Sequence, residues 1–178
     1  EALGLTLDFT PETLPFLDHY RDHYIRSVGA SDTDGDLIRP EFLQLVAPMA
    51  ACYFGEVVRR SHQTRWVTPT DKPPDWRMEF VDCFMYFNPM DVAVESFLGY
   101  QSDAVPGSIQ VSREQRSGVR KVLDNQPPIR PEDFYRFTVR WETLDLISFH
   151  LLQDKTLKGD QDRTFSESDY LRHIDAEE

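Results

Sequence analysis

The sequence is poor in cysteine and has no long apolar run. Its 178 residues include two cysteines, Cys52 and Cys83, which are too few for a disulfide framework and favour a reducing compartment. No stretch of about 18 consecutive apolar residues is present, so we expect no transmembrane helix. No signal peptide and no Asn-x-Ser/Thr acceptor site is visible. Together these absences predict a cytoplasmic location.

Positive charge is also scarce. The chain has 31 acidic and 19 basic residues, a net charge of −12. Residues 1–89 hold 8 basic and 14 acidic residues and the remainder holds 11 and 17, so each half carries −6. Phosphate binding needs clustered Lys and Arg, so we expect neither nucleic acid nor an anionic membrane as a partner. A basic protein partner is electrostatically favoured.

The common catalytic and cofactor motifs are missing. There is no phosphate-binding loop, GxGxxG, GxSxG, HExxH or CxxC pattern, and neither cysteine has an evident electropositive setting. The sequence therefore predicts no cofactor and favours a protein that is not an enzyme. A catalytic triad leaves no fixed linear trace, so an enzyme remains an open alternative.

What the chain has is enough apolar surface for one core. Hydrophobic residues make up 40% and aromatic residues 12% of the sequence, a composition typical of a globular domain. We predict a single α+β domain over 1–160, with a core over 4–99, a helical extension over 100–160 and a polar acidic tail over 161–178 containing about one helical turn near Tyr170.

The first half reads as a strand and two helices. Residues 4–8 alternate like a short strand, and Thr10-Pro11 opens a helix that Gly29 ends. A second helix is predicted from Pro40 to about His62, with a kink or a junction of two helices at Pro48.

The remainder predicts a small sheet and more helices. Strands are expected over 64–68 and 76–87, separated by a turn over 70–75, and the second run changes phase near Asp82, which indicates a bulge or turn. Helices are expected from Asn88 to Gly99, over 112–124 and over 131–155. Residues 135–141 also alternate with period two, so a strand there stays open.

Glu56 is the residue whose placement most needs an explanation. Helical spacing predicts an apolar stripe, interrupted by this acid, made of Phe42, Val46, Met49, Tyr53, Val57 and Arg60. A withdrawn carboxylate must find a partner or raise its pKa. One hypothesis is a pocket built from Tyr53, Glu56, Arg60 and Trp66. The alternative is structural: an ion pair with Arg60, or a hydrogen bond from the Trp66 indole. Gly55 is expected to be a packing glycine.

Two weaker patterns suggest metals. Residues 30–41 can be laid on a calcium-binding EF-hand loop, with Asp32, Asp34 and Glu41 as ligands, but Ala30 stands where an Asp is expected. His19 and His23 have the i, i+4 spacing that can bind zinc, yet they fall on the solvent face and have no third ligand. We therefore expect no native metal, with the calcium loop as an alternative.

The motif around Glu56 resembles that of a group of uncharacterised bacterial domains. The shared pattern is an aromatic-x-Gly-Glu-Val segment with following arginines, then a tryptophan and an apolar strand that turns into a helix. Here the pattern corresponds to Tyr53 to Arg60, Trp66 and Phe84 to Phe97, and the resemblance covers roughly residues 4–99. The resemblance implies a shared α+β core and carries no activity.

The favoured hypothesis is a soluble, non-enzymatic binding or regulatory protein of bacteria. One version is an immunity-like protein that neutralises a basic toxin through its acidic surface. The alternatives are an enzyme with a pocket around Glu56, Arg60 and Trp66, and a calcium-binding module. The oligomeric state is not indicated by the sequence.

Overall fold

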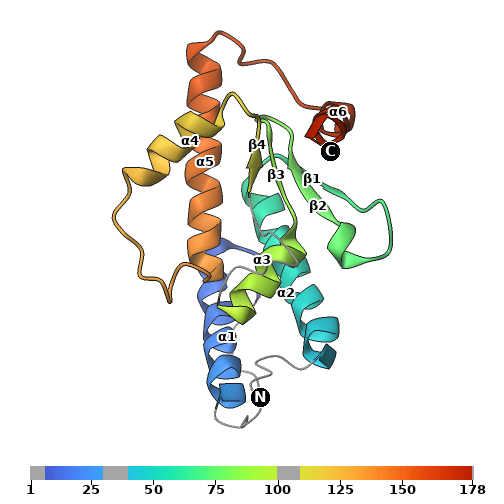
Figure 1. Ribbon diagram of the computed structural model, residues 1–178, viewed down its shortest axis with the longest axis vertical. Coiled ribbons are helices and arrows are strands. Elements are labelled where there is room, and N and C mark those ends of the chain that lie inside the picture. The colour runs from blue at the N-terminus through green and yellow to red at the C-terminus, as the bar shows by residue number, and fades with distance from the viewer. Residues whose placement is uncertain (1–6, 30–39, 100–108, 178) are drawn as a thin grey trace.

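The computed structural model describes residues 7–29, 40–99 and 109–177. In these residues, helices surround a four-stranded antiparallel sheet, so the predicted α+β class is confirmed (Figure 1). The helices are α1 (Leu14–Gly29), α2 (Pro40–Ser61), α3 (Pro89–Leu98), α4 (Arg116–Asp124), α5 (Phe137–Leu157) and α6 (Glu167–Glu177). No helix among the described residues is long and apolar enough to cross a bilayer.

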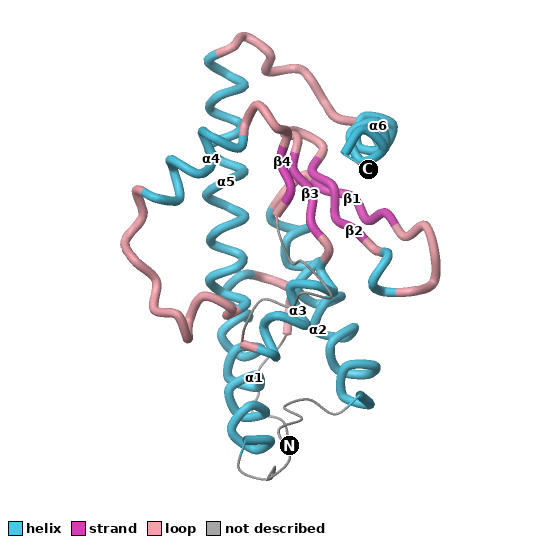
Figure 2. Tube along the Cα trace, viewed as in Figure 1, coloured by secondary structure: helices cyan, strands magenta, loops and turns pink. Residues whose placement is uncertain are grey.

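The sheet is a meander with strands in chain order. It consists of β1 (Thr64–Val67), β2 (Arg77–Phe80), β3 (Met85–Phe87) and β4 (Gln110–Val111), and short 3₁₀ turns at Pro11–Thr13 and Pro73–Asp75 precede α1 and β2. The expected phase change near Asp82 is a turn between β2 and β3. Helix α3 follows β3 directly, and Figure 2 shows it beside α2.

Strand alternation separates an apolar face from a polar one. Trp66 pairs with Met78, and Met78 pairs with Phe87, on the face that α2 covers. On the opposite face, Arg65 pairs with Glu79. The polar face is covered by the C-terminal segment, where Tyr170 is fully buried. The tail therefore forms an eleven-residue helix, α6, rather than the single turn expected from its polar composition.

The buried face of α2 differs from the predicted stripe. Met49 is 64% exposed, and Val46 and Tyr53 are only half-buried. The core side is made of Phe54 and of smaller residues, namely Ala47, Ala50, Ala51, Val57 and Val58. Of these, Val57 was part of the predicted stripe, and the side chain of Phe42 lies outside the described residues. Alanines let α2 and α3 approach closely, and this packing rotates the buried face by about one residue from the stripe of large side chains. Helix α2 runs through Pro48 as one element.

Several observed boundaries differ from the predicted ones. Leu7 and Asp8 are not in a strand, and residues 4–6 lie outside the described residues. Helix α4 begins at Arg116, four residues later than predicted, and the Ser112 hydroxyl donates to the Gln115 side chain at 2.8 Å. Helix α5 begins at Phe137, six residues later than predicted, and the alternative strand over 135–141 is wrong.

The start of α5 is determined by α1. Asp18, 3% exposed, accepts hydrogen bonds from the backbone N–H groups of Phe137 (2.7 Å) and Thr138 (3.2 Å) and from the Thr138 hydroxyl (2.6 Å). The first N–H groups of a helix have no partner within the helix, and a carboxylate also favours the positive end of the helix dipole. This contact attaches α1 to α5.

Candidate functional site

Glu56 fastens α2 to the first strand. Its carboxylate accepts two bonds from Arg59 Nε (2.8 and 3.0 Å) and one from Arg59 Nη2 (2.8 Å). The Trp66 indole N–H donates to Oε1 at 2.9 Å, which confirms the predicted indole contact. The expected ion pair with Arg60 is replaced by one with Arg59. The side chain is 28% exposed, so the acid is only partly withdrawn from water.

Tyr53 and Arg60 serve a different contact, with the segment before α1. The Tyr53 hydroxyl lies 2.5 Å from the Thr13 hydroxyl, and its ring stacks on Phe9. Arg60 donates to the Asp8 carbonyl at 2.7 Å and lies over the Phe9 ring. The four residues predicted to form one cluster therefore make two adjacent contacts, both structural in geometry.

The electrostatics of Glu56 oppose the pocket hypothesis. Hydrogen bonding from Arg59 lowers the pKa of Glu56, where the hypothesis predicted a raised pKa. None of Tyr53, Glu56, Arg60 and Trp66 lines either of the two cavities described below. An ionised carboxylate held by a guanidinium and an indole is suited to fastening two elements, and poorly suited to proton transfer.

The structure describes the predicted histidine pair and both cysteines, but not the predicted calcium loop. Residues 30–39 of the proposed calcium loop lie outside the described residues, as does the Glu41 side chain. His19 and His23 are both exposed, as predicted, and the described residues contain no group of three metal-ligating side chains. Cys52 and Cys83 are not disulfide-bonded, and burial raises the pKa of Cys83 to about 12, which opposes a nucleophilic role.

An apolar groove lies between α4, α5 and the connection that joins them. It has a volume of about 1060 Å³. The connection, residues 125–136, bows away from α5 (Figure 1), and its residues Pro127, Ile129 and Phe134 are among those that line the groove. We call this site the α4–α5 groove; its apolar lining is Ile109, Val111, Val119, Leu123, Pro127, Pro128, Ile129, Phe134, Val139, Leu146 and Ile147.

Three large apolar side chains of this groove face solvent. Leu123 is 37% exposed, Phe134 43% and Ile129 46%. Asp124 and Glu142 also line the groove. The basic residues on the solvent side of α4 (Arg116, Arg120 and Lys121) do not line the groove.

A buried ion pair lies at the base of the groove. Arg140 donates to Glu95 of α3 at 2.6 Å, and its guanidinium lies over the rings of Phe134 and Tyr135. Burial lowers the pKa of Arg140, while burial and the nearby Glu95 raise the pKa of Asp91 to about 7. The charge of Arg140 is thus neutralised by its ion pair with Glu95. The other charged residues that line the groove are Asp124 and Glu142.

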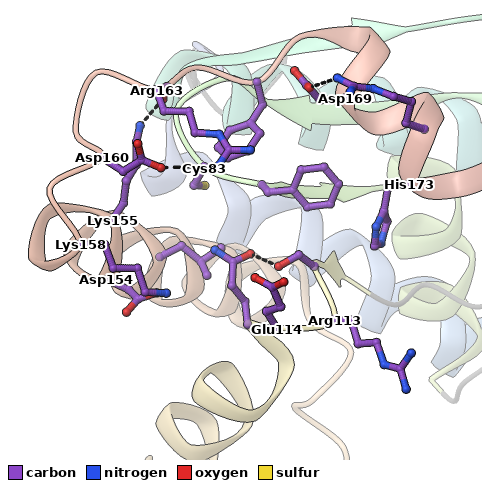
Figure 3. A pocket seen from close by; sticks show the side chains of 16 residues that line it. Cys83, Arg113, Glu114, Asp154, Lys155, Lys158, Asp160, Arg163, Asp169 and His173 are labelled. Atoms are coloured by element: carbon purple, nitrogen blue, oxygen red, sulfur yellow. Dashed lines mark hydrogen bonds and ion pairs between the residues drawn. The ribbon is translucent and has the colours of Figure 1, made fainter. Parts of the chain in front are cut away.

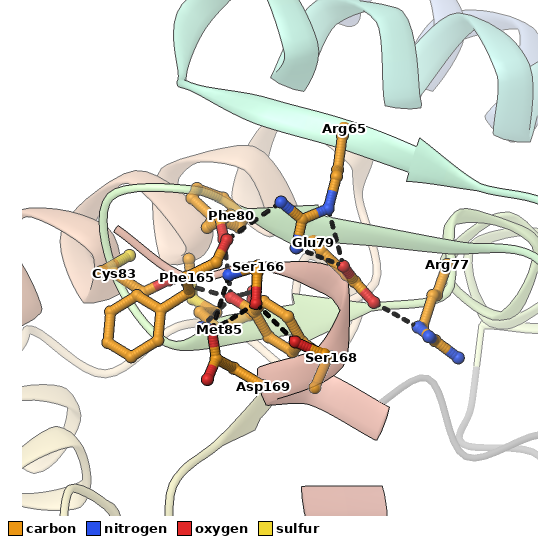
Figure 4. A network of polar contacts seen from close by, with 11 residues as sticks. Arg65, Arg77, Glu79, Phe80, Cys83, Met85, Phe165, Ser166, Ser168 and Asp169 are labelled. Atoms are coloured by element: carbon orange, nitrogen blue, oxygen red, sulfur yellow. Dashed lines mark hydrogen bonds and ion pairs between the residues drawn. The ribbon is translucent and has the colours of Figure 1, made fainter. Parts of the chain in front are cut away.

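The sheet carries a second buried charge that sequence reasoning missed. Glu79 is fully buried and receives Arg65 (2.7 Å) and Arg77 (2.6 Å), which approach its carboxylate from two sides (Figure 4). Nearby, the Tyr170 hydroxyl donates to the Phe80 carbonyl (2.7 Å) and accepts from the Met85 N–H (3.2 Å). An acidic residue within an alternating strand is a sign of such a buried charge. The sequence alone, however, did not indicate that Arg65 and Arg77 would be its partners.

The comparisons with known proteins give no further guide. A scan against protein-family models matched no family, and searches of curated proteins and of solved structures found no similar protein. The resemblance to bacterial domains with the aromatic-x-Gly-Glu-Val motif stays a prediction. The functional argument therefore depends on the geometry of this chain.

Proposed function

We propose that this is a non-enzymatic binding protein that accepts a basic, amphipathic segment of a partner protein in the α4–α5 groove. The observation that carries the proposal is the concentration of exposed Leu123, Ile129 and Phe134 in one concave surface of an otherwise acidic molecule. Exposed apolar surface gathered in a groove is typical of peptide recognition, where a helix inserts apolar side chains at i, i+3, i+4 and i+7.

Charge favours a basic occupant over an acidic one. Asp124 and Glu142 lie on the groove wall, and the net charge of −12 attracts cationic partners over longer distances. Lysines or arginines beside the apolar stripe of the partner would meet these two acids. This chemistry fits the hypothesis of an immunity-like or regulatory protein acting on a basic target.

The test is a calorimetric titration with a synthetic helical peptide, leucine on one face and lysine on the other. We expect saturable one-to-one binding that weakens as salt rises. Ile129→Lys and Leu123→Lys should each weaken binding at least about tenfold, because each places a positive charge in the apolar contact, where it also repels the lysines of the peptide.

The matched control is Leu157→Lys, a leucine on α5 that is 87% exposed and does not line the groove. It adds the same charge elsewhere and should leave affinity nearly unchanged. Equal weakening by all three substitutions would mean that the peptide responds to net charge alone, and the groove assignment would be wrong.

A further inference from the structure

A second cavity lies at the C-terminal end of α5, whereas the α4–α5 groove lies along the first half of that helix. It has a volume of about 540 Å³, within the range of small-molecule sites, and is lined by residues of the end of α5, the connection to α6, α6 itself and the turn before α4. Aromatic rings form part of its wall: Phe84 meets Phe165 edge to face at 5.5 Å and His173 at 4.9 Å. We call it the α5–α6 pocket.

The charges around this pocket do not cancel. Three acids are matched by their own bases: Asp154 with Lys158, Asp160 with Arg163, and Asp169 with Arg172. Lys155, Arg113 and Glu114 also line the pocket, and among the described residues none of them forms an ion pair. The pocket is therefore less negative than the molecule as a whole.

Lys155 is a cation of the pocket wall that forms no ion pair among the described residues. It is part-buried, and its ammonium group donates to the backbone carbonyls of Asp82 (2.8 Å) and Arg163. An ammonium has three donors, so one remains, while Arg113 and Glu114 are exposed and solvated. A half-buried charge without a counter-ion is costly, and a bound anion would offset that cost.

Arg163 can assist at the same side of the pocket. Its contact with Asp160 is long, at 3.5 Å, and its side chain is 57% exposed. Replacing this weak ion pair with a contact to a ligand should therefore cost little free energy. Figure 3 shows Lys155 and Arg163 on one side of the pocket and His173 on the opposite side. The Phe165 ring lies against Arg163 (4.8 Å), whereas the His173 ring packs on Phe84 (4.9 Å) on the opposite side. A ligand with an anionic group attached to a ring could reach both Lys155 and the Phe84–His173 pair.

We propose that the α5–α6 pocket binds a small aromatic anion, with its carboxylate or phosphate at Lys155 and Arg163 and its ring against Phe84 and His173. This site is separate from the α4–α5 groove, and its ligand would also bridge α5 to the segment that carries α6. Binding should therefore stabilise the docked position of α6.

The test uses two probes and their neutral counterparts in calorimetry with the full chain. Phenylacetate is compared with phenylacetamide, and adenosine monophosphate with adenosine, which distinguishes a carboxylate from a phosphate ligand. We expect at least one anion to bind with a dissociation constant of about 1 mM or tighter, and at least about tenfold more tightly than its neutral counterpart.

Variants locate the binding. Lys155→Met should weaken the anion at least about tenfold, Lys155→Arg should retain binding, and Lys158→Met, which removes a lysine already paired with Asp154, should change it less than about twofold. If Lys155→Met fails to fold by circular dichroism, Arg163→Gln on an exposed side chain takes its place. Binding of neither anion, equal binding of the neutral probes, or equal loss in the Lys155 and Lys158 variants would overturn the proposal.

Discussion

Gly55 offers the sharpest test of how α2 meets the sheet. A Cβ placed on Gly55 would lie closer than 3.0 Å to two ring atoms of Trp66 and 3.3 Å from the Met78 terminal methyl. The substitution Gly55→Ala must therefore displace the indole, which also donates to Glu56 at 2.9 Å. The Trp66 ring thus occupies the space that a Cβ at position 55 would need, as expected for a packing glycine.

The expected magnitude combines three effects. Alanine gains about 1 kcal/mol over glycine in a helix interior. Overpacking costs about 1 to 3 kcal/mol, and loss of a hydrogen bond to a charged group costs about 1.5 kcal/mol or more. The net prediction is that Gly55→Ala destabilises the protein by about 1.5 to 3.5 kcal/mol, measured by urea unfolding followed by circular dichroism.

The double mutant separates the clash from helix propensity. In a Trp66→Ala background the obstruction is gone, so Gly55→Ala should stabilise the protein by about 1 kcal/mol. The sign of the effect should thus reverse between the two backgrounds. Stabilisation of similar size in both would show that no indole lies over Gly55, and the described contact between α2 and β1 would be wrong.

Three further outcomes are expected. Asp18→Ala should lower the free energy of unfolding by about 2 to 3 kcal/mol, since it leaves two N–H groups of α5 without partners, and Asp18→Asn should restore part of that loss in urea unfolding. Burial raises the pKa of Asp91 to about 7, so the folded protein holds this proton more tightly than the unfolded chain does. The free energy of unfolding should therefore fall as pH rises from about 4 to 7. Asp91→Asn should remove this pH dependence and stabilise the protein at pH 8 by about 1 to 2 kcal/mol. Tyr170→Phe should cost about 1 to 3 kcal/mol and increase amide exchange in α6 above that of α3, while equal exchange in both helices would argue against the docking role of the hydroxyl.

Elements with local signals were predictable from sequence. Helix α3 begins and ends as expected, because the Asn88 side chain accepts from the Met90 N–H at 2.8 Å and Gly99 adopts the left-handed conformation at φ 74°. The hydrogen bond from Trp66 to Glu56 was also predictable, because the two residues are ten positions apart in adjoining elements.

Features fixed by distant residues were not predictable. Asp18 caps a helix that starts at Phe137, so the true beginning of α5 is encoded in α1 rather than in its own first turn. Tyr170 is buried by strands roughly ninety residues earlier in the chain, which is why the polar tail gave little sign of docking. The groove itself is formed by the α4–α5 connection, whose path depends on tertiary contacts.

The groove assignment can be tested most directly by methyl-resolved NMR during titration with the leucine–lysine peptide. The account predicts that the methyl groups of Leu123, Ile129 and Leu146 shift together and saturate with one affinity, while those of Leu157 and Leu171 stay in place. Larger shifts at Leu157 or Leu171 than in the groove, or no shift at saturating peptide, would contradict it.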